Sequence, residues 1–297
     1  MRIAVTGSTG LIGSAVARAL GASHEVVTVG RRPKSQVRVD LADTTAVAAM
    51  DTGPLDALVH CAGVTDEDFH SDPEGAMRMA VFGADALVTS AVAAGAKRIV
   101  YVSSAHTYGP LVGVVDENTA VNPVSDYAIA HFATEQVFRR HVSGGVGAAV
   151  LRPCAVFGDL RDVEDFRRWS LIPFSFPRDA VVDHAVTIRS TGEQRRNFVG
   201  TEDIANCCSR WLDGGSGGWN VLNPVGQLTT SVHEFAQMCA SVSEEVTGRT
   251  CTVSRVPPRG PTIGDDFDYT TRSSLTRGTQ DLRSAVARLM HALVQER

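Results

Sequence analysis

The chain has 297 residues, a formal net charge of −5 and 43% hydrophobic residues. A chain of this length buries roughly three quarters of its unfolded surface, which is enough for one large domain or two closely joined ones. The negative balance argues against a protein that holds the phosphate backbone of nucleic acids, because such a protein needs a cationic surface. We therefore expect no nucleic-acid partner.

The first residues and the cysteines indicate the compartment. Residues 1–6 reach Gly7 after a few apolar side chains, a run too short for a signal peptide or a membrane span and typical of a β-strand. Six cysteines, at positions 61, 154, 207, 208, 239 and 251, show no C-x-x-C spacing. Isolated thiols of this kind are typical of a reducing compartment. We expect a cytoplasmic chain with no membrane contact, no disulfide and no metal site.

Short β-rich runs alternate with helical patterns in the first half of the chain. The predicted strands are Arg2–Thr6, Glu25–Gly30, 56–61, 98–103 and 146–151. The predicted helices are Leu11–Gly21, 73–95 and 125–142, with Gly21 and Gly95 at positions typical of helix C-caps. Because such alternation implies right-handed crossovers, the sequence predicts an α/β fold with a doubly wound parallel sheet.

The pattern changes after Leu151, where Arg152-Pro153 interrupts the strand. We predict a dinucleotide-type domain over residues 1–152. A smaller, partly interleaved C-terminal lobe for the substrate covers 153–297, with about 197–213 returning to the first domain. The expected elements are an irregular stretch over 166–184, a strand over 197–200, a helix from Thr201 or Glu202 to Leu212, a helix capped by Thr230 or Ser231 and running through Val246, a loop over 257–266 and an amphipathic helix over 280–295.

A glycine-rich turn joins the first strand to the first helix. Gly7 permits the tight turn, Gly10 lets the backbone approach a pyrophosphate, and Gly13 allows close helix packing. A phosphate then meets free N–H groups and the positive end of the helix dipole. The sequence thus predicts a Rossmann-type dinucleotide site whose turn contributes Gly7, Thr9, Gly10, Leu11, Ile12 and Gly13.

The second predicted strand ends in Val29-Gly30-Arg31-Arg32 and carries no carboxylate there. An NAD-binding fold places Asp or Glu at this point, against the ribose 2′-hydroxyl. Two guanidiniums favour a 2′-phosphate instead, through charge-assisted hydrogen bonds. We therefore expect NADP(H) to be preferred over NAD(H). The alternative is that Arg31 and Arg32 are solvated loop charges.

Five further segments extend the pattern along nearly the whole chain: 39–41, 59–63, 100–109, 151–158 and 195–199. With the glycine turn, they make the chain resemble an extended short-chain dehydrogenase/reductase, in particular the epimerases, dehydratases and ketoreductases of nucleotide sugars. The resemblance implies that the cofactor also contacts residues further along the sheet edge, namely Asp40, Leu41, Cys61, Ala62, Gly63, Ser103, Pro153 and Val156.

The resemblance also implies the catalytic residues. Ser104 stands four residues before Tyr108-Gly109 and is the expected hydrogen-bond donor to the reacting oxygen. Tyr127 is the expected acid/base, because hydride transfer to a carbon that bears oxygen needs a matching proton. Both would touch the substrate, and Tyr127 also the cofactor. The alternatives are a strand-end hydroxyl for Ser104 and a surface aromatic for Tyr127.

One position departs from the family. Its Tyr-x-x-x-Lys motif here reads Tyr127-Ala-Ile-Ala-His131. Residues four apart share a helix face, so His131 still points toward the tyrosine and the nicotinamide ribose. Its charge is less assured, because histidine titrates near pH ~6.5. Three hypotheses follow: an imidazole that orients ribose and relays protons, a slow enzyme, or a cofactor-binding protein without turnover.

The residues around the predicted site bear on the reaction. Ala105-His106 replaces the acidic pair of the family's dehydratases, which leaves reduction of a keto sugar by dissociable NADPH or epimerisation on a retained cofactor. We favour reduction. His106 is either a substrate donor or structural, and Arg196 and Arg272 match arginines that bind substrate phosphates in similar enzymes.

Other interpretations stay open. Ala155 and Ala80 stand where relatives often have Asn, so the substrate could be a carbonyl compound other than a nucleotide sugar. A sensor or scaffold protein that binds NADP(H) without turnover is a further alternative, for which the loss of the lysine is the main argument. By analogy with the family, we expect a homodimer that packs through the helices over 73–95 and 125–142.

Overall fold

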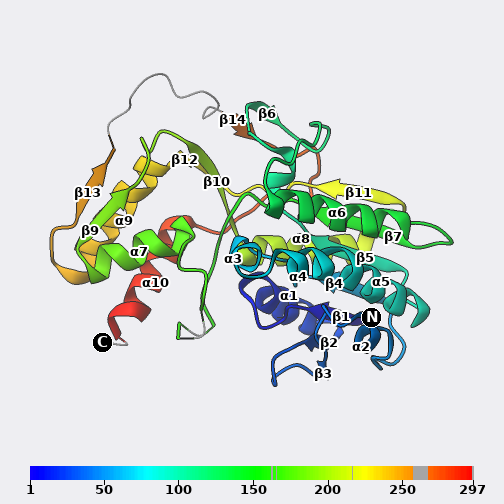
Figure 1. Ribbon diagram of the computed structural model, residues 1–297. Coiled ribbons are helices and arrows are strands. Elements are labelled where there is room, and N and C mark those ends of the chain that lie inside the picture. Colours follow the sequence, from blue (N-terminus) through cyan, green and yellow to red (C-terminus); the bar gives the residue numbers. More distant parts are fainter. Residues whose placement is uncertain (162, 165, 216, 257–266, 296–297) are drawn as a thin grey trace.

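The computed structural model describes residues 1–161, 163–164, 166–215, 217–256 and 267–295. The loop predicted over 257–266 lies outside the described residues. The larger part of the molecule is a seven-stranded parallel sheet (Figure 1), which confirms the predicted doubly wound fold. In spatial order its strands are β11 (Trp219–Leu222), β7 (Gly147–Leu151), β5 (Arg98–Val102), β4 (Ala57–His60), β1 (Arg2–Thr6), β2 (Glu25–Gly30) and β3 (Val37–Arg38).

Helices cover both faces of the large sheet. Side chains alternate along a strand, so Ile3 and Val5 of β1 pack on one face and Ala4 on the other. The first face is covered by α1 (Leu11–Gly21) and α8 (Thr201–Gly214). The second face is covered by α2 (Thr44–Ala48), η1 (Met79–Gly83), α5 (Ala84–Ala93) and α6 (Asp126–Arg140). Helix α4 (Pro73–Arg78) packs against α6 in a separate small cluster.

The run α4–η1–α5 forms one helical rod with a π-helical turn in its middle. The segment Pro73–Ala93 has a mean hydropathy of 1.3 and is long and apolar enough to cross a membrane. One such helix is weak evidence for a membrane span, because core helices of globular proteins have the same length and composition. Leu87 and Val88 are fully buried against the sheet. A core helix of the layered fold accounts for this apolar pattern.

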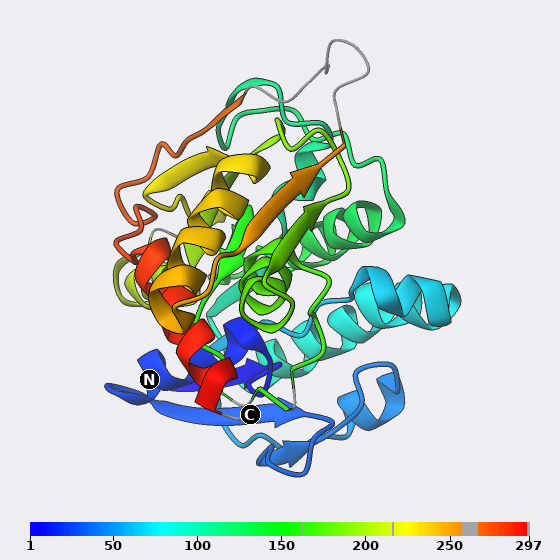
Figure 2. The same ribbon diagram turned by 90° about the vertical axis from the view of Figure 1, so that its left-hand side faces the viewer.

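The smaller lobe has its own core (Figures 1 and 2). It contains the sheet β8 (Ala155–Phe157), β10 (Arg195–Gly200) and β12 (Leu228–Ser231), the pair β9 (Ala185–Ile188) and β13 (Thr252–Arg255), and the helices α7 (Ile172–Val182), α9 (Val232–Thr247) and α10 (Leu282–Gln295). The chain returns from this lobe to the large sheet through α8 and β11. A separate parallel pair, β6 (Gly113–Val115) with β14 (Phe267–Tyr269), lies above the sheet edge in Figure 1. Two short helices, α3 (Asp66–Ser71) and η2 (Ala105–Tyr108), follow β4 and β5.

Two local predictions are wrong. The stretch 166–184 was expected to be irregular, yet α7 spans Ile172–Val182. Pro173 lies in the first turn, where no backbone donor is needed, and burial of Phe174 and Phe176 outweighs the interior Pro177. Gly21 is the last residue of α1 rather than its cap, whereas Gly95 has the left-handed φ of +109° expected after a helix end.

A buried ion pair connects the catalytic helix to the sheet. Arg152 donates from Nε to Glu135 Oε1 at 2.9 Å and from Nη2 to Oε2 at 2.5 Å, and Ser103 Oγ donates to Oε1 at 2.6 Å. The two charged side chains are 5% and 0% exposed. Burial would lower the pKa of Arg152, but the hydrogen bonds and charge of Glu135 raise it above its ordinary value. The pair therefore stays ionised.

Removing one partner of this pair should destabilise the protein strongly. In Arg152→Met the Glu135 carboxylate is left buried without a counter-charge, so we expect the free energy of unfolding in urea to fall by about 3–5 kcal/mol. The matched control is Arg283→Met, which removes an exposed ion pair with Glu245 and should cost less than about 1 kcal/mol. Equal losses in the two variants would contradict the role of the buried pair.

Candidate functional site

A large cleft lies at the carboxyl ends of the parallel strands, between the sheet and the smaller lobe. Its volume is about 2220 Å³, well above the roughly 300–1,000 Å³ of a pocket for one drug-sized ligand. Strand order reverses between β1 and β4, and ligands of such sheets bind at this switch point. The predicted residues that line the cleft are Thr9, Gly10, Leu11, Ile12, Gly13, Arg32, Cys61, Gly63, Ser103, Ser104, His106, Tyr127, His131, Pro153, Val156 and Arg196.

The glycine turn forms the cradle predicted for a pyrophosphate. Gly7 has a φ of +66°, and a Cβ there would lie 2.8 Å from the backbone nitrogen of Ala62. A Cβ on Gly13 would lie 2.1 Å from the Gly7 carbonyl oxygen. Helix α1 begins directly afterwards at Leu11, so its free N–H groups face the cleft. Only glycine fits this close backbone packing at positions 7 and 13.

The predicted adenosine side of the site is only partly assembled. Arg32 lines the cleft together with Lys34. Arg31 is 71% exposed, lies 3.9 Å from Asp40 and does not line the cleft. Leu41 is buried and lies beside Gly83 of η1. A Cβ on Gly83 would lie 2.2 Å from the Leu41 carbonyl oxygen. The structure thus brings Arg32, but not Arg31, Asp40 or Leu41, to the cleft.

Ser104 and Tyr127 meet at the carboxyl end of β5. Ser104 caps η2, where its Oγ accepts the His106 N–H at 3.2 Å. Tyr127 lies in the first turn of α6, which Ser125 caps. Burial raises the pKa of Tyr127, while a hydrogen bond with Ser104 and the charge of Arg168 act in the opposite direction. Tyr127 is therefore a protonated phenol at neutral pH.

His131 lies on the same face of α6 as Tyr127, with ring centroids 4.4 Å apart, as its i, i+4 spacing predicts. Its Nδ1 lies 2.6 Å from the hydroxyl of Tyr101 on β5. Burial lowers the pKa of His131 from 6.5 to about 3, so the imidazole is neutral at physiological pH. A neutral His131 supplies no positive charge to Tyr127, because burial desolvates the ring.

The orientation of His131 fits a bound dinucleotide. Burial raises the pKa of Tyr101 far above its ordinary value, so its hydroxyl donates to Nδ1 and the remaining proton sits on Nε2. In the described part of the chain, Nε2 has no hydrogen-bond partner. It lies beside Gly63, where a Cβ would approach the ring to 3.1 Å. A ribose hydroxyl would satisfy this buried donor.

Behind His131 lies a chain of buried side chains that the sequence did not indicate. Thr6 Oγ1 and His60 Nδ1 are 2.7 Å apart, and the His60 ring stacks on Tyr101 at 5.3 Å. Burial lowers the pKa of His60 to about 4. The chain leads into the core and not to solvent, so it fixes the orientation of Tyr101 and His131.

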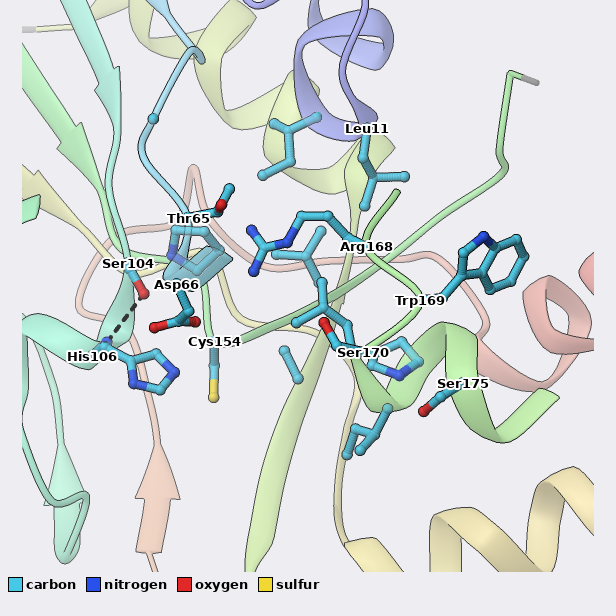
Figure 3. A pocket seen from close by; sticks show the side chains of 18 of the residues that line it. Leu11, Thr65, Asp66, Ser104, His106, Cys154, Arg168, Trp169, Ser170 and Ser175 are labelled. Atoms are coloured by element: carbon cyan, nitrogen blue, oxygen red, sulfur yellow. Dashed lines mark hydrogen bonds between the residues drawn. The ribbon is translucent and has the colours of Figure 1, made fainter. Parts of the chain in front are cut away.

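The cleft around Ser104 and Tyr127 carries further polar groups suited to a substrate (Figure 3). The His106 ring lies edge-on to that of Tyr127, with ring centroids 5.6 Å apart. Burial and the positive charge of Arg196 lower the pKa of His106. Arg196 enters the cleft from β10. Sequence reasoning missed Asp66 and Arg168, which also line the cleft. No motif or spacing rule pointed to either position.

The prediction for Arg272 is wrong. Its side chain is 65% exposed and lies 3.4 Å from Asp116, outside the cleft. The backbone N–H of Arg272 also donates to Glu117 Oε2 at 2.9 Å. Because β14 pairs in parallel with β6, the residues after β14 are held against those after β6.

Comparisons with known proteins identify the family. The model of the "NAD dependent epimerase/dehydratase family" matches residues 3–221. The match covers more than half of the chain, so this chain belongs to that family.

Two curated relatives and two solved structures illustrate the likeness. "Methionine adenosyltransferase 2 subunit beta" of Danio rerio is 30% identical over 217 residues, covering 70% of this chain and 62% of that protein. "2'-dehydrokanamycin reductase" of Streptomyces kanamyceticus is 33% identical over 153 residues, covering 51% of this chain and 41% of that protein. The chain thus spans less than two thirds of either relative.

The fold likeness covers the whole chain. RMD from Pseudomonas aeruginosa complexed with NADPH superimposes with a TM-score of 0.82 at 18% identity, over 100% of this chain and 99% of that one. MoeE5 in complex with UDP-glucuronic acid and NAD gives 0.80 at 24% identity over the same shares. At these identities the structural match supports the fold.

The buried histidines should make the protein sensitive to acid. Their folded pKa values, about 4 for His60 and about 3 for His131, lie below the ordinary 6.5. The unfolded state therefore takes up protons first, and stability present above pH 6.5 is lost as pH falls toward these values. Each histidine contributes up to about 1.4 kcal/mol per pH unit. Urea unfolding of wild type and His131→Gln between pH 7 and 5 measures this, and identical slopes would contradict it.

Proposed function

We propose that the protein is an NADP(H)-dependent reductase of a keto group on a nucleotide-linked sugar. The observation that carries this proposal is the pairing of Ser104 and Tyr127 in a cleft that also holds the glycine cradle. A phenol and a hydroxyl at the carboxyl end of β5 supply the proton and the hydrogen bond that reduction of a carbonyl needs.

Each side chain has a defined task in this mechanism. A bound NADPH supplies a hydride for the carbonyl carbon. Ser104 donates a hydrogen bond to the carbonyl oxygen, because its own Oγ already accepts from the His106 N–H. Tyr127 delivers the proton, because the buried phenol is protonated at neutral pH. His131 would hold the ribose of a bound cofactor with its Nε2–H, and the Tyr101 hydroxyl fixes that tautomer.

The preference for NADP(H) rests on Arg32 and Lys34, two cations that line the end of the cleft beyond the glycine turn. The cofactors printed for solved neighbours are mixed, with NADPH in RMD and NAD in MoeE5. The sequence carries no carboxylate at the end of β2 to bind a ribose 2′-hydroxyl.

Arg32→Ala should weaken NADPH binding by about 10- to 100-fold, since a hydrogen bond between charged groups contributes about 1.5–3 kcal/mol. NADH binding should change little. Arg31→Ala is the matched control, and its smaller effect follows from its position outside the cleft. Isothermal titration with both cofactors measures these affinities. Tighter binding of NADH by the wild type would contradict the preference.

The substrate class is proposed from Arg196 and from the relatives. Arg196 places a guanidinium in the substrate half of the cleft, where a phosphate would be held. MoeE5 is described with UDP-glucuronic acid, and a relative is named "2'-dehydrokanamycin reductase". The missing acidic pair after Ser104 argues against dehydration.

Tyr127→Phe should lower kcat for NADPH-dependent reduction of a keto nucleotide sugar by about 10²- to 10⁴-fold, because the proton donor is removed. NADPH affinity should persist. Arg196→Ala should raise KM more than it lowers kcat, whereas unchanged substrate binding would favour a small non-nucleotide carbonyl compound. Steady-state kinetics of both variants measures this, and an active Tyr127→Phe variant would overturn the mechanism.

Two other functions have specific support. An epimerase would use the same residues and retain its cofactor, and epimerases are among the structural neighbours. Mass analysis of the purified protein separates the two, since a co-purified NAD(P)+ favours epimerisation. A scaffold or sensor role is favoured by the neutral His131 and by a relative named as a subunit of methionine adenosyltransferase.

Assembly and location are part of the proposal. Phe82 of η1 is 62% exposed and Ile129 of α6 is 44% exposed, and the two elements are in contact. Covering this apolar surface supports a homodimer through the helices of this face. All six cysteines are free thiols, which supports a cytoplasmic location.

A further inference from the structure

Tyr127 needs a neighbouring positive charge if its proton is to leave easily. Burial raises its pKa, and Asp66, whose carboxylate lies on the same side of the cleft, raises it further. His131 is neutral and supplies no charge. His106 faces Tyr127 edge-on, but its pKa is also lowered. Neither histidine therefore supplies the positive charge that Tyr127 needs.

Arg168 reaches the phenol from the smaller lobe. It lies between β8 and α7, and Figure 3 shows its guanidinium extending across the cleft toward Thr65, Asp66 and Ser104. Tyr127 lines the same cleft edge-on to His106, whose backbone N–H donates to Ser104, and the charge of Arg168 acts to lower the pKa of the phenol. Arg168 thus occupies a position from which its charge acts directly on the reacting oxygen.

Aromatic contacts hold the segment that carries Arg168. The ring of Phe166 lies 4.6 Å from that of Phe174 and packs edge-on against Trp169 at 5.0 Å. The guanidinium of Arg178 lies 5.2 Å over the Trp169 ring. Phe166 and Trp169, on either side of Arg168 in the chain, are therefore both packed against α7, and this packing directs the arginine into the cleft.

Arg168 forms no tight ion pair among the described residues. Its Nε lies 3.9 Å from Glu67 Oε2, beyond hydrogen-bond distance, and has no hydrogen-bond partner among the described residues. Glu67 is held instead by Ser170, whose Oγ donates to Oε1 at 2.9 Å. Its side chain is 30% exposed, so the guanidinium is partly shielded from bulk water.

We infer that Arg168 is the electrostatic partner of Tyr127 and supplies, from the opposite wall of the cleft, the positive charge that His131 does not. This rests on the proposed role of Tyr127 as proton donor. When the phenol O–H bond breaks and its proton passes to the alkoxide formed by hydride addition, the electron pair stays on the phenol oxygen. The Arg168 guanidinium stabilises that phenolate, with Asp66 as an opposing charge.

The direct test is the ionisation of Tyr127 in the protein without substrate or cofactor. Tyrosinate absorbance is titrated in each protein and in the same protein carrying Tyr127→Phe, and the difference isolates Tyr127. Tyr101, Tyr108 and Tyr269, the other tyrosines, have raised pKa values and cancel in the difference. Circular dichroism at each pH verifies that the fold persists.

Arg168→Gln should raise the ionisation midpoint of Tyr127 by about 1 pH unit or more, the effect of losing a close opposite charge. Arg168→Lys should keep the midpoint close to wild type. Arg167→Gln, which removes an adjacent exposed arginine, should leave it unchanged. In reduction, kcat of Arg168→Gln should fall by about 10-fold or more, with its alkaline limb moved upward.

The outcomes separate this inference from the proposed function. An unmoved midpoint in Arg168→Gln would overturn the inference, even if activity falls, because the loss would then reflect substrate contacts. A raised midpoint together with no reductase activity in any variant would sustain the inference and remove the proposed reaction.

Discussion

The buried pair of Glu135 and Arg152 is the constraint on which the site depends. Glu135 belongs to the helix that carries Tyr127 and His131, and Arg152 lies directly after β7. The same carboxylate accepts from Ser103, the neighbour of Ser104. One ion pair thus fixes a helix, the end of β5 and the start of the smaller lobe. Two desolvated charges contribute little net stability compared with apolar groups, but they restrict the arrangement because any other leaves a buried charge unpaired.

The replacement of lysine by histidine has consequences throughout this region. A lysine at position 131 would need solvent or an anion near its ammonium, whereas an imidazole can be buried if one nitrogen accepts a hydrogen bond. Tyr101 supplies that bond, and His60 and Phe138 stack around it. The rigid aromatic packing orients the ring toward the cofactor position. The replacement of lysine by histidine removes a permanent cation from beside Tyr127. A positive charge near the phenol must then come from another element.

Sequence reasoning succeeded where the determinants are local. The glycine turn and the bounds of Leu11–Gly21 follow from residues adjacent in the chain, as does the shared face of Tyr127 and His131. It failed where the determinants are distant. Arg168 and Tyr127 are 41 positions apart in the chain but line the same cleft, an arrangement that no spacing rule describes. Arg272 was assigned by resemblance, but the pairing of β14 with β6 determines where it lies.

The charge of the cleft differs in sign from that of the chain. The protein carries a formal net charge of −5, yet Arg32, Lys34, Arg168 and Arg196 all line the cleft. A concave site with walls of low polarity concentrates the field of such cations, so anionic ligands are attracted despite the overall charge. These cations are spaced from the glycine turn to the substrate wall, which suits a ligand with separated phosphates. One of them also acts on the phenol, so the field that attracts the ligands is the field that favours loss of the proton. Binding and chemistry therefore depend on the same charges, and a substitution that weakens one is expected to alter the other.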